Sequence, residues 1–263
     1  MMKRLGFVGS GAITSAIVTG LCSEGGAAYE ICLSPRNAEV AAELASRFEK
    51  VRVAASNQAV LDESEIVVIA VRPQIAEAVL ADLRFRPDHH VISLVAGYPV
   101  QRMTPLVTPA AVVSRAVPLP MSARRRCPTA VYPRDPVAME LFNLLGQAFA
   151  VETDDVLAAF STATSTMAAY FAYADCIAGW MTNNGVAPQQ ARDYVAQIFA
   201  GMAMTAVEGP DRTFPALAED HATRGGLNEQ VLRDLRSHHV CESITEALDS
   251  VMRRVTAASR QAL

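Results

Sequence analysis

Short apolar runs and amphipathic helical patterns alternate from Leu5 to Gln147. An apolar run bounded by turn residues is typical of a strand in a parallel sheet, because helices cover both faces of such a sheet. The alternation therefore predicts a doubly wound α/β sheet, with ligands at the carboxyl ends of its strands. The predicted strands are Leu5–Val8, Tyr29–Leu33, Val51–Ala54, Glu65–Val71, Val91–Val95, Val112–Ser114 and Thr129–Tyr132. The predicted helices are Ala12–Leu21, Ala38–Phe48, Ile75–Leu83 and Pro136–Gln147, and Asn57 is expected in a turn.

The pattern changes at Asp154, after which only helical periods remain. The sequence therefore predicts two domains, a Rossmann-type domain at residues 1–153 and an all-α domain at residues 154–263. Because the first long helix is apolar around much of its circumference, we expect it to pack against a second copy of the chain; an intramolecular core helix is the alternative. Its polar residues, Asp175 among them, favour a buried helix over a membrane span. The predicted helices are Val156–Asn183, Pro188–Glu208, Phe214–Ala222, Leu227–Arg236 and Cys241–Arg260.

The first strand runs directly into Gly9-Ser10-Gly11 and then into a helix. Strand, glycine turn and helix in this order indicate a dinucleotide-binding βαβ unit. Gly9 permits the tight turn, and Gly11 lets a pyrophosphate approach the backbone and the amino end of the helix. Thr14 stands where the motif expects a third small residue. A glycine turn in another kind of α/β protein remains the alternative.

The end of the second strand distinguishes NADPH from NADH. An NAD enzyme usually carries Asp or Glu there to hold the ribose 2′-OH. This chain has Ser34 at that position and Arg36 two residues later. A hydroxyl and a guanidinium suit a 2′-phosphate, which a carboxylate would repel. The sequence therefore predicts NADPH.

Composition and charge exclude several classes of partner. The net charge is -4 and 51% of the residues are hydrophobic, so we expect neither nucleic-acid binding nor a polybasic membrane patch. The five cysteines are scattered without metal-ligand spacing, which favours reduced thiols in the cytoplasm and no metal. The pairs His89-His90 and His238-His239 are expected to be surface or cap residues. We expect no signal peptide.

A second glycine turn, Gly225-Gly226, precedes a predicted helix. Two glycines at a helix start expose several N–H groups that suit a carboxylate, although a plain helix entry explains them equally well. With this turn, the chain resembles the Δ1-pyrroline-5-carboxylate reductase family over nearly its whole length. The similar segments are Gly6–Gly11, the Ser-Pro-Arg-Asn turn at 34–37, Asn57, Ile69–Gln74, Leu94–Gly97, Ser114–Pro118 and Ala222–Gly226.

The resemblance implies NADPH-dependent reduction of a cyclic imine, 1-pyrroline-5-carboxylate to L-proline, in proline biosynthesis. It also implies a homodimer through the C-terminal helices, with further assembly left open. The implied cofactor-binding residues are Gly9, Gly11, Ala12, Ile13, Ser34, Arg36, Asn57, Ala70, Val71, Arg72, Pro73, Ala96 and Gly97. The implied substrate-binding residues are Pro118, Leu119, Thr166, Gly225, Gly226, Leu227 and Asn228, of which Thr166 and Asn228 are the catalytic candidates.

The departures from the family fall in the substrate motifs. Met-Pro-Asn-Thr-Pro becomes residues 117–121, Val-Pro-Leu-Pro-Met, and Met167 replaces a glycine of Gly-Ser-Gly-Pro-Ala-Tyr. Gly-Gly-Thr-Thr becomes residues 225–228, and Arg224 replaces a proline. Two alternatives therefore stay open: a reductase of a different imino or oxo acid, and a non-catalytic NADP-binding regulator. A β-hydroxyacid dehydrogenase is disfavoured, because that class uses a lysine on the long helix and this chain has only Lys3 and Lys50.

Overall fold

The computed structural model describes residues 3–23 and 29–260. Contacts divide the chain into two compact units. Unit 1 comprises Met1–Ser161 with Met252–Leu263, and unit 2 comprises Thr162–Val251. This division differs from a boundary after residue 153, because most of the first helix beyond that residue and the end of the last helix have their contacts in unit 1.

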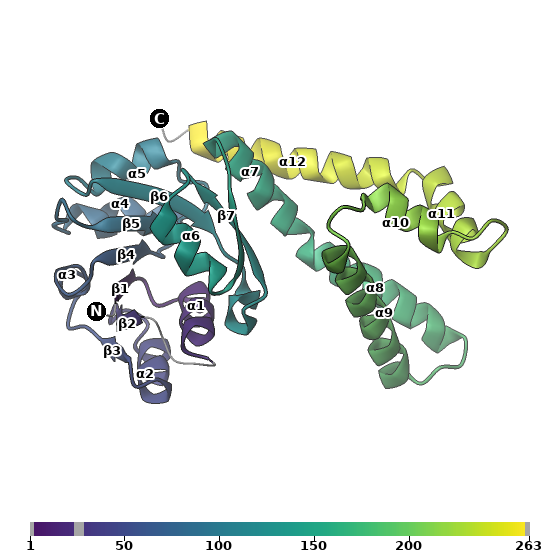
Figure 1. The fold of residues 1–263 in the computed structure, drawn as a ribbon, viewed down its shortest axis with the longest axis horizontal. Helices are drawn as coiled ribbons and strands as arrows, with labels where there is room; N and C mark the ends of the chain where they lie inside the picture. The colour runs from purple at the N-terminus through teal and green to yellow at the C-terminus, as the bar shows by residue number, and fades with distance from the viewer. Residues whose placement is uncertain (1–2, 24–28, 261–263) are drawn as a thin grey trace. The chain divides into compact units, whose positions relative to one another are not determined.

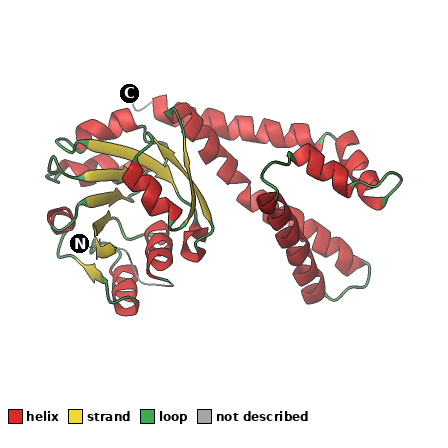
Figure 2. Cartoon of the chain, in the orientation of Figure 1, coloured by secondary structure: helices red, strands yellow, loops and turns green. Residues whose placement is uncertain are grey.

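Unit 1 is built on an eight-stranded sheet in the order β3-β2-β1-β4-β5-β6-β7-β8 (Figure 1). The strands from β3 to β6 in that order are parallel, β7 runs antiparallel to β6, and β8 is parallel to β7. In Figure 2 the strands, drawn in yellow, all lie in this unit. Their bounds are β1 Lys3–Val8, β2 Tyr29–Leu33, β3 Val51–Val53, β4 Ile66–Ile69, β5 His90–Ser93, β6 Val112–Val117, β7 Cys127–Tyr132 and β8 Gly146–Ala150.

Helices pack on both faces of the sheet and close two hydrophobic cores. One core takes side chains from α1 (Ala12–Cys22), α2 (Ala38–Arg47) and α6 (Pro136–Asn143). The other takes side chains from α3 (Asn57–Asp62), α4 (Pro73–Ala81) and α5 (Val100–Leu106). The predicted doubly wound sheet is therefore confirmed.

The predicted helix Pro136–Gln147 is wrong at its carboxyl end, and the prediction of seven strands missed β8. The helix ends at Asn143, and the chain returns to the sheet at Gly146. Gly146 has φ 145°, and a Cβ on it would lie 2.4 Å from the Cys127 carbonyl oxygen. This conformation and close approach require glycine, so Gly146 fixes the start of β8.

Two short helices were not predicted. Asn57 is the first residue of α3 rather than part of a turn, because the Ser56 hydroxyl accepts a hydrogen bond from the Ala59 N–H at 3.1 Å and caps the helix. The helix α5 follows Pro99. Between β6 and β7 the chain also forms the short 3₁₀ helix η1, Pro120–Arg124.

From Asp154 onward the described residues form helices, as predicted, but the first long helix is interrupted. It is divided into α7 (Asp154–Ala163), the 3₁₀ turn η2 (Thr164–Thr166) and α8 (Met167–Asn183). The Ser165 hydroxyl donates to the Thr162 carbonyl at 2.7 Å, and the Thr166 hydroxyl donates to the Ala163 carbonyl at 2.8 Å. Such local bonds compete with the α-helical ladder. The remaining helices are α9 Pro188–Glu208, α10 Phe214–His221, α11 Leu227–Ser237 and α12 Val240–Arg260.

The helices of unit 2 leave large apolar side chains exposed. The rings of Tyr170 and Tyr173 on α8 pack against Phe199 on α9, with centroids 5.5 and 5.7 Å apart. Nevertheless α8 has no buried residue, and Phe171 and Trp180 are 69% and 66% exposed. An exposed apolar surface of this kind on a helical unit is typical of an interface with another chain.

A buried carboxylate ties α6 to the sheet. Asp135 caps α6, because its side chain accepts from the Val137 and Ala138 N–H groups. It also accepts from the His90 ring at 2.6 Å and from the Ser114 hydroxyl at 3.2 Å. Burial alone would raise the pKa of Asp135, but these hydrogen bonds hold it below its usual value.

The prediction that both members of the His89-His90 pair are surface or cap residues is wrong for His89. Its side chain is buried, with Nδ1 placed to accept from the Arg86 N–H at 3.0 Å and Nε2 at 3.0 Å from the Leu61 carbonyl. Burial lowers the pKa of His89. His89 is therefore a neutral core residue that links two loops of unit 1.

We predict that Asp135→Ala lowers the free energy of unfolding by about 3 kcal/mol at neutral pH, because it removes a cap and leaves buried donors unpaired. Since the pKa of Asp135 is lower in the folded state than in the unfolded state, its contribution is present above the unfolded pKa and is lost as pH falls through the folded pKa. Urea unfolding at a series of pH values should therefore show that the free energies of unfolding of wild type and Asp135→Ala approach each other below about pH 4. Glu49→Gln, at an exposed position, is the control. A difference that stays constant with pH would contradict the assignment.

Candidate functional site

The carboxyl ends of the strands on both sides of β1 form one continuous edge of the sheet. The Ser34 N–H donates to the Phe7 carbonyl at 3.0 Å, and the Ala70 N–H donates to the Val8 carbonyl at 2.9 Å. The Leu94 N–H donates to the Ile69 carbonyl at 2.8 Å. These bonds align the residues that follow β1, β2, β4 and β5. The structure therefore brings the predicted cofactor-binding segments together at a single edge.

The turn after β1 is shaped as a phosphate cradle. Gly9 has φ 110°, and a Cβ there would lie 2.5 Å from the Ala70 carbonyl oxygen, so only glycine fits. A Cβ on Gly11 would meet nothing within 4 Å, which leaves room for a ligand. No side chain caps the first turn of α1, where Ala12 and Ile13 lie, so that end can accept an anion.

Thr14 explains the departure from the three-glycine motif. Its side chain is buried, and its hydroxyl donates to the Gly9 carbonyl at 2.7 Å. This bond closes the turn from inside the helix. The third small residue is therefore replaced by one that holds the loop in place.

Three side chains, those of Ser10, Ser34 and Asn37, hold the loop after β2. Of these, only Ser34 was predicted as a cofactor-binding residue. The Ser10 hydroxyl donates to the Ser34 carbonyl at 2.7 Å, and the Asn37 amide donates to the Ser10 carbonyl at 3.0 Å. Ser34 itself is buried, and its hydroxyl accepts from the Arg36 N–H at 3.4 Å. Arg36 is exposed and forms no ion pair with any described residue. In this loop Arg36 offers a free cation to a phosphate, whereas Ser34 mainly supports the loop.

The remaining cofactor candidates lie at the ends of β3, β4 and β5. Asn57 Oδ1 is buried without a hydrogen-bond partner among the described residues, which indicates a donor that the chain does not supply. Ala70–Pro73 form the turn from β4 into α4, with Arg72 and Pro73 exposed. Ala96 and Gly97 follow β5, and Gly97 has φ 64°. These features fit an extended dinucleotide along the edge.

The predicted substrate residues are divided between the two units. Pro118 and Leu119 follow β6 in unit 1, and Leu119 is 9% exposed with its N–H placed against the Cys127 sulfur at 3.1 Å. Its side chain is therefore largely buried in unit 1. Thr166 lies in unit 2, where its hydroxyl is used by the Ala163 carbonyl.

The second glycine turn carries its own carboxylate. Gly225 has φ 74°, and its N–H donates to Glu229 Oε2 at 2.6 Å. The Gly226 N–H donates to the Thr223 carbonyl at 2.8 Å, and the Asn228 amide donates to the His221 carbonyl at 2.9 Å. Leu227 is 82% exposed. Two of the turn's N–H groups and the Asn228 side chain are thus already engaged within the chain.

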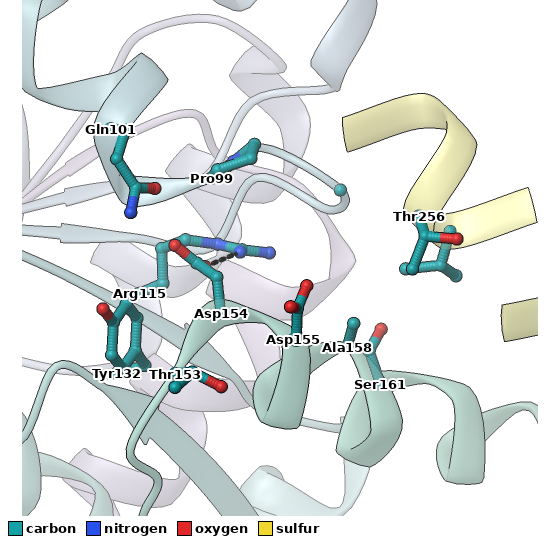
Figure 3. Close-up of a pocket in the computed structure, with 12 residues that line it drawn as sticks. Pro99, Gln101, Arg115, Tyr132, Thr153, Asp154, Asp155, Ala158, Ser161 and Thr256 are labelled. Atoms are coloured by element: carbon teal, nitrogen blue, oxygen red, sulfur yellow. Dashed lines mark hydrogen bonds and ion pairs between the residues drawn. The ribbon is translucent and has the colours of Figure 1, made fainter. Parts of the chain in front are cut away.

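Sequence reasoning missed a cavity of about 580 Å³ in unit 1, shown in Figure 3. Arg115 on β6 forms an ion pair there with Asp154 at the start of α7. Burial lowers the pKa of the Arg115 guanidinium, and the Asp154 carboxylate opposes that shift. A charged residue within the apolar run around Ser114–Val117 was the available signal, because a buried charge needs a partner. The cavity is lined by Gly97, Pro99, Gln101, Arg115, Tyr132, Thr153, Asp154, Asp155, Ala158, Ser161, Val255 and Thr256.

Metal-ligand clusters and membrane-spanning helices are both absent from the described part of the chain. No group of three or more His, Cys, Asp or Glu side chains there is placed to hold a metal ion. No helix among those residues is long and apolar enough to cross a membrane.

Both halves of the chain match known families. Residues 4–97 match the family described as NADP oxidoreductase coenzyme F420-dependent. Residues 154–258 match the family described as Pyrroline-5-carboxylate reductase dimerisation. The two matches cover the glycine turn of unit 1 and the helices of unit 2.

Curated relatives extend over most of the chain. A pyrroline-5-carboxylate reductase from Vibrio alginolyticus is 25% identical over 263 residues, covering 96% of each chain. Another from Haemophilus influenzae is 24% identical over 262 residues, again covering 96% of each.

Solved structures share the fold. A 1-pyrroline-5-carboxylate reductase from Streptococcus pyogenes superposes with a TM-score of 0.83 at 21% identity, covering 97% of this chain and 98% of that one. A pyrroline carboxylate reductase from Plasmodium falciparum with NADP bound has a TM-score of 0.81 at 16% identity, covering 98% of each. A reductive aminase from Aspergillus terreus has a TM-score of 0.60 at 18% identity, covering 99% of this chain and 94% of that one.

We predict different outcomes for alanine at the two glycines of the first turn. Gly11→Ala should leave the melting temperature unchanged and weaken NADPH binding about tenfold or more, because its Cβ enters space open to the ligand. Gly9→Ala should lower the free energy of unfolding by about 2 kcal/mol or more, because it combines an unfavourable φ with a backbone clash. Thermal unfolding and fluorescence titration with NADPH measure both effects. Unchanged NADPH affinity in folded Gly11→Ala would contradict the assigned cradle.

Proposed function

Because the chain belongs to the pyrroline-5-carboxylate reductase family, we propose that it catalyses the NADPH-dependent reduction of 1-pyrroline-5-carboxylate to L-proline. The observation that carries the proposal is the cofactor edge of unit 1, in a chain whose residues 4–97 match an NADP oxidoreductase family and whose residues 154–258 match the pyrroline-5-carboxylate reductase dimerisation family. NADPH supplies the hydride when bound. A protonated cyclic imine is already electrophilic, so the chain's contribution is mainly to bind and orient.

In this proposal, each residue of the cofactor edge has its own role in binding NADPH. The open space at Gly11 and the uncapped start of α1 receive the pyrophosphate. Arg36 receives the 2′-phosphate, and the unpartnered Asn57 Oδ1 accepts a hydrogen bond from the cofactor. Ala70–Pro73 and Ala96–Gly97 line the rest of the edge. The substrate groups Pro118, Thr166 and Gly225–Asn228 are assigned by family resemblance, with Thr166 and Asn228 as catalytic candidates.

A second candidate substrate class is favoured by Glu229. The family resemblance assigns the substrate carboxylate to N–H groups of the second glycine turn, but the Glu229 carboxylate already accepts from Gly225 there. A second carboxylate at the same place would meet like-charge repulsion. A cyclic imine without a carboxylate would avoid this conflict. The chain would then reduce a different imine on the same cofactor edge.

We further propose that the chain functions as a homodimer in the cytoplasm, in proline biosynthesis if the first substrate class is correct. The match to a dimerisation family and the exposed apolar side chains of α8 support assembly through unit 2. The five cysteines, all among the described residues, form no disulfide, which supports a reducing compartment.

We predict that Arg36→Ala raises the Michaelis constant for NADPH about tenfold or more and leaves that for NADH nearly unchanged, because Arg36 would contact only the 2′-phosphate. Steady-state kinetics with both cofactors measure the change. Arg84→Ala, at another exposed arginine of unit 1, is the control. An unchanged NADPH constant would refute the assignment.

The two substrate classes are separated by comparing 1-pyrroline-5-carboxylate with 1-pyrroline, which lacks the carboxylate. If Glu229 excludes a substrate carboxylate, wild type prefers 1-pyrroline, and Glu229→Ala raises kcat/KM for 1-pyrroline-5-carboxylate about tenfold or more. Glu242→Ala, at an exposed position of α12, should change neither value. A wild type that prefers the carboxylated imine, and keeps that preference in Glu229→Ala, would instead support the first class. Turnover of neither imine would refute both reductase proposals.

A further inference from the structure

The cavity around Arg115 contains a buried cation whose hydrogen-bonding capacity is only partly used. The Arg115 side chain is 9% exposed, and its Nη1 donates to Asp154 Oδ1. Asp154 Oδ2 accepts from the Val100 N–H at 3.2 Å, so both oxygens of that carboxylate are engaged. No described residue accepts from Nε or Nη2 of Arg115. These two groups are open to the cavity, so they can donate to water or to a ligand there.

A second, uncommitted carboxylate faces the same space. Asp155 follows Asp154 on α7, and Figure 3 shows its carboxylate turned into the gap beside the Arg115 guanidinium. Asp155 forms no ion pair with any residue that the structure describes. The same cavity is therefore lined by a cation with unused donors and by a carboxylate without an ion-pair partner among the described residues.

Neutral polar groups complete the lining. The Gln101 side-chain amide points toward Arg115 in Figure 3 and can donate to the same acceptor. The Thr256 hydroxyl donates to the Met252 carbonyl at 2.9 Å, which leaves its oxygen able to accept from a ligand. Pro99, Ala158 and Val255 add apolar surface.

We propose that this cavity binds a small α-amino acid in its zwitterionic form. The ligand carboxylate accepts from Arg115 and Gln101, and its ammonium group donates to Asp155 and the Thr256 oxygen. With Arg115 paired to Asp154, the charge of Asp155 is uncompensated, so a plain anion is disfavoured. A plain cation would satisfy Asp155 but would leave the free Arg115 N–H groups without an acceptor, which a molecule with both charges supplies. The cavity, at about 580 Å³, has ample room for such a ligand. The site lies within unit 1; it shares Gly97 with the cofactor edge and includes neither Gly9 nor Gly11 of the cradle.

The test is calorimetric titration of the full-length protein with a panel of the proteinogenic amino acids in the absence of cofactor. At least one is expected to bind, and its decarboxylated amine and its deaminated acid are each expected to bind about tenfold or more weakly. Asp155→Asn and Gln101→Glu should each weaken binding by a similar factor, since one removes the ammonium partner and the other repels the carboxylate. Asp82→Asn, an exposed carboxylate of unit 1 away from the cavity, should bind as wild type does.

Two results would overturn the proposal. One is that no amino acid in the panel binds, in which case water satisfies Arg115. The other is binding that Asp155→Asn and Gln101→Glu leave unchanged, which would place the ligand elsewhere. Thermal unfolding and NADPH titration of each variant verify that it is folded. The probes of this cavity are amino acids rather than imines. A lack of amino-acid binding therefore does not bear on the proposed reductase activity, and a lack of imine turnover does not bear on the proposed amino-acid site.

Discussion

The close approach of β1 and β4 at the carboxyl edge is the constraint on which unit 1 depends. The two strands are neighbours in the sheet, and the Ala70 N–H donates to the Val8 carbonyl. The chain must then leave β1 directly beside the Ala70 carbonyl, which only a residue without Cβ and with positive φ can do. Gly9 therefore lets the sheet change direction at β1, with β2 and β3 on one side and β4 onward on the other. Ligands of α/β proteins bind at such a reversal of strand order.

Two adjacent residues of β6 connect the sheet to two helices. Ser114 and Arg115 are adjacent on β6, so their side chains point to opposite faces. Ser114 meets Asp135, which caps α6, and Arg115 meets Asp154, which begins α7. Each of these two polar side chains is thus paired with a carboxylate at the amino end of a helix, where negative charge is also favoured by the helix dipole. Two helices are positioned by one dipeptide.

The local pattern predicted much of the fold because most elements have local causes. The first seven strands were identified from apolar runs, and α9 was predicted with its bounds, Pro188–Glu208. The strand β8 was missed because Gly146 acts through a close approach to Cys127, which lies far from it in sequence. The interruption after Ala163 was missed because apolar periodicity does not record hydroxyl bonds to the backbone.

The same distinction applies to the candidate site. The cofactor edge is built from short segments that each follow a strand, so a sequence pattern can place them on one edge. The Arg115 cavity depends on a pairing with Asp154 across 39 positions, and the family segment Ser114–Pro118 that contains Arg115 does not indicate that partner. Long-range ion pairs of this kind leave no periodic signal. The presence of Arg115 in an apolar strand was the one sequence feature that indicated an ion pair.

The second glycine turn shows how specificity can change while the backbone motif is retained. Gly225, with φ 74°, and Gly226 form the turn that precedes α11. Glu229 lies in the first turn of the same helix, so its carboxylate reaches the Gly225 N–H without a loop to close. An attached carboxylate competes with a dissolved one at an effective concentration on the order of millimolar or higher. A substrate carboxylate must therefore displace Glu229 or bind elsewhere. If the turn binds the substrate as proposed, this single side chain is sufficient to alter which imines it accepts.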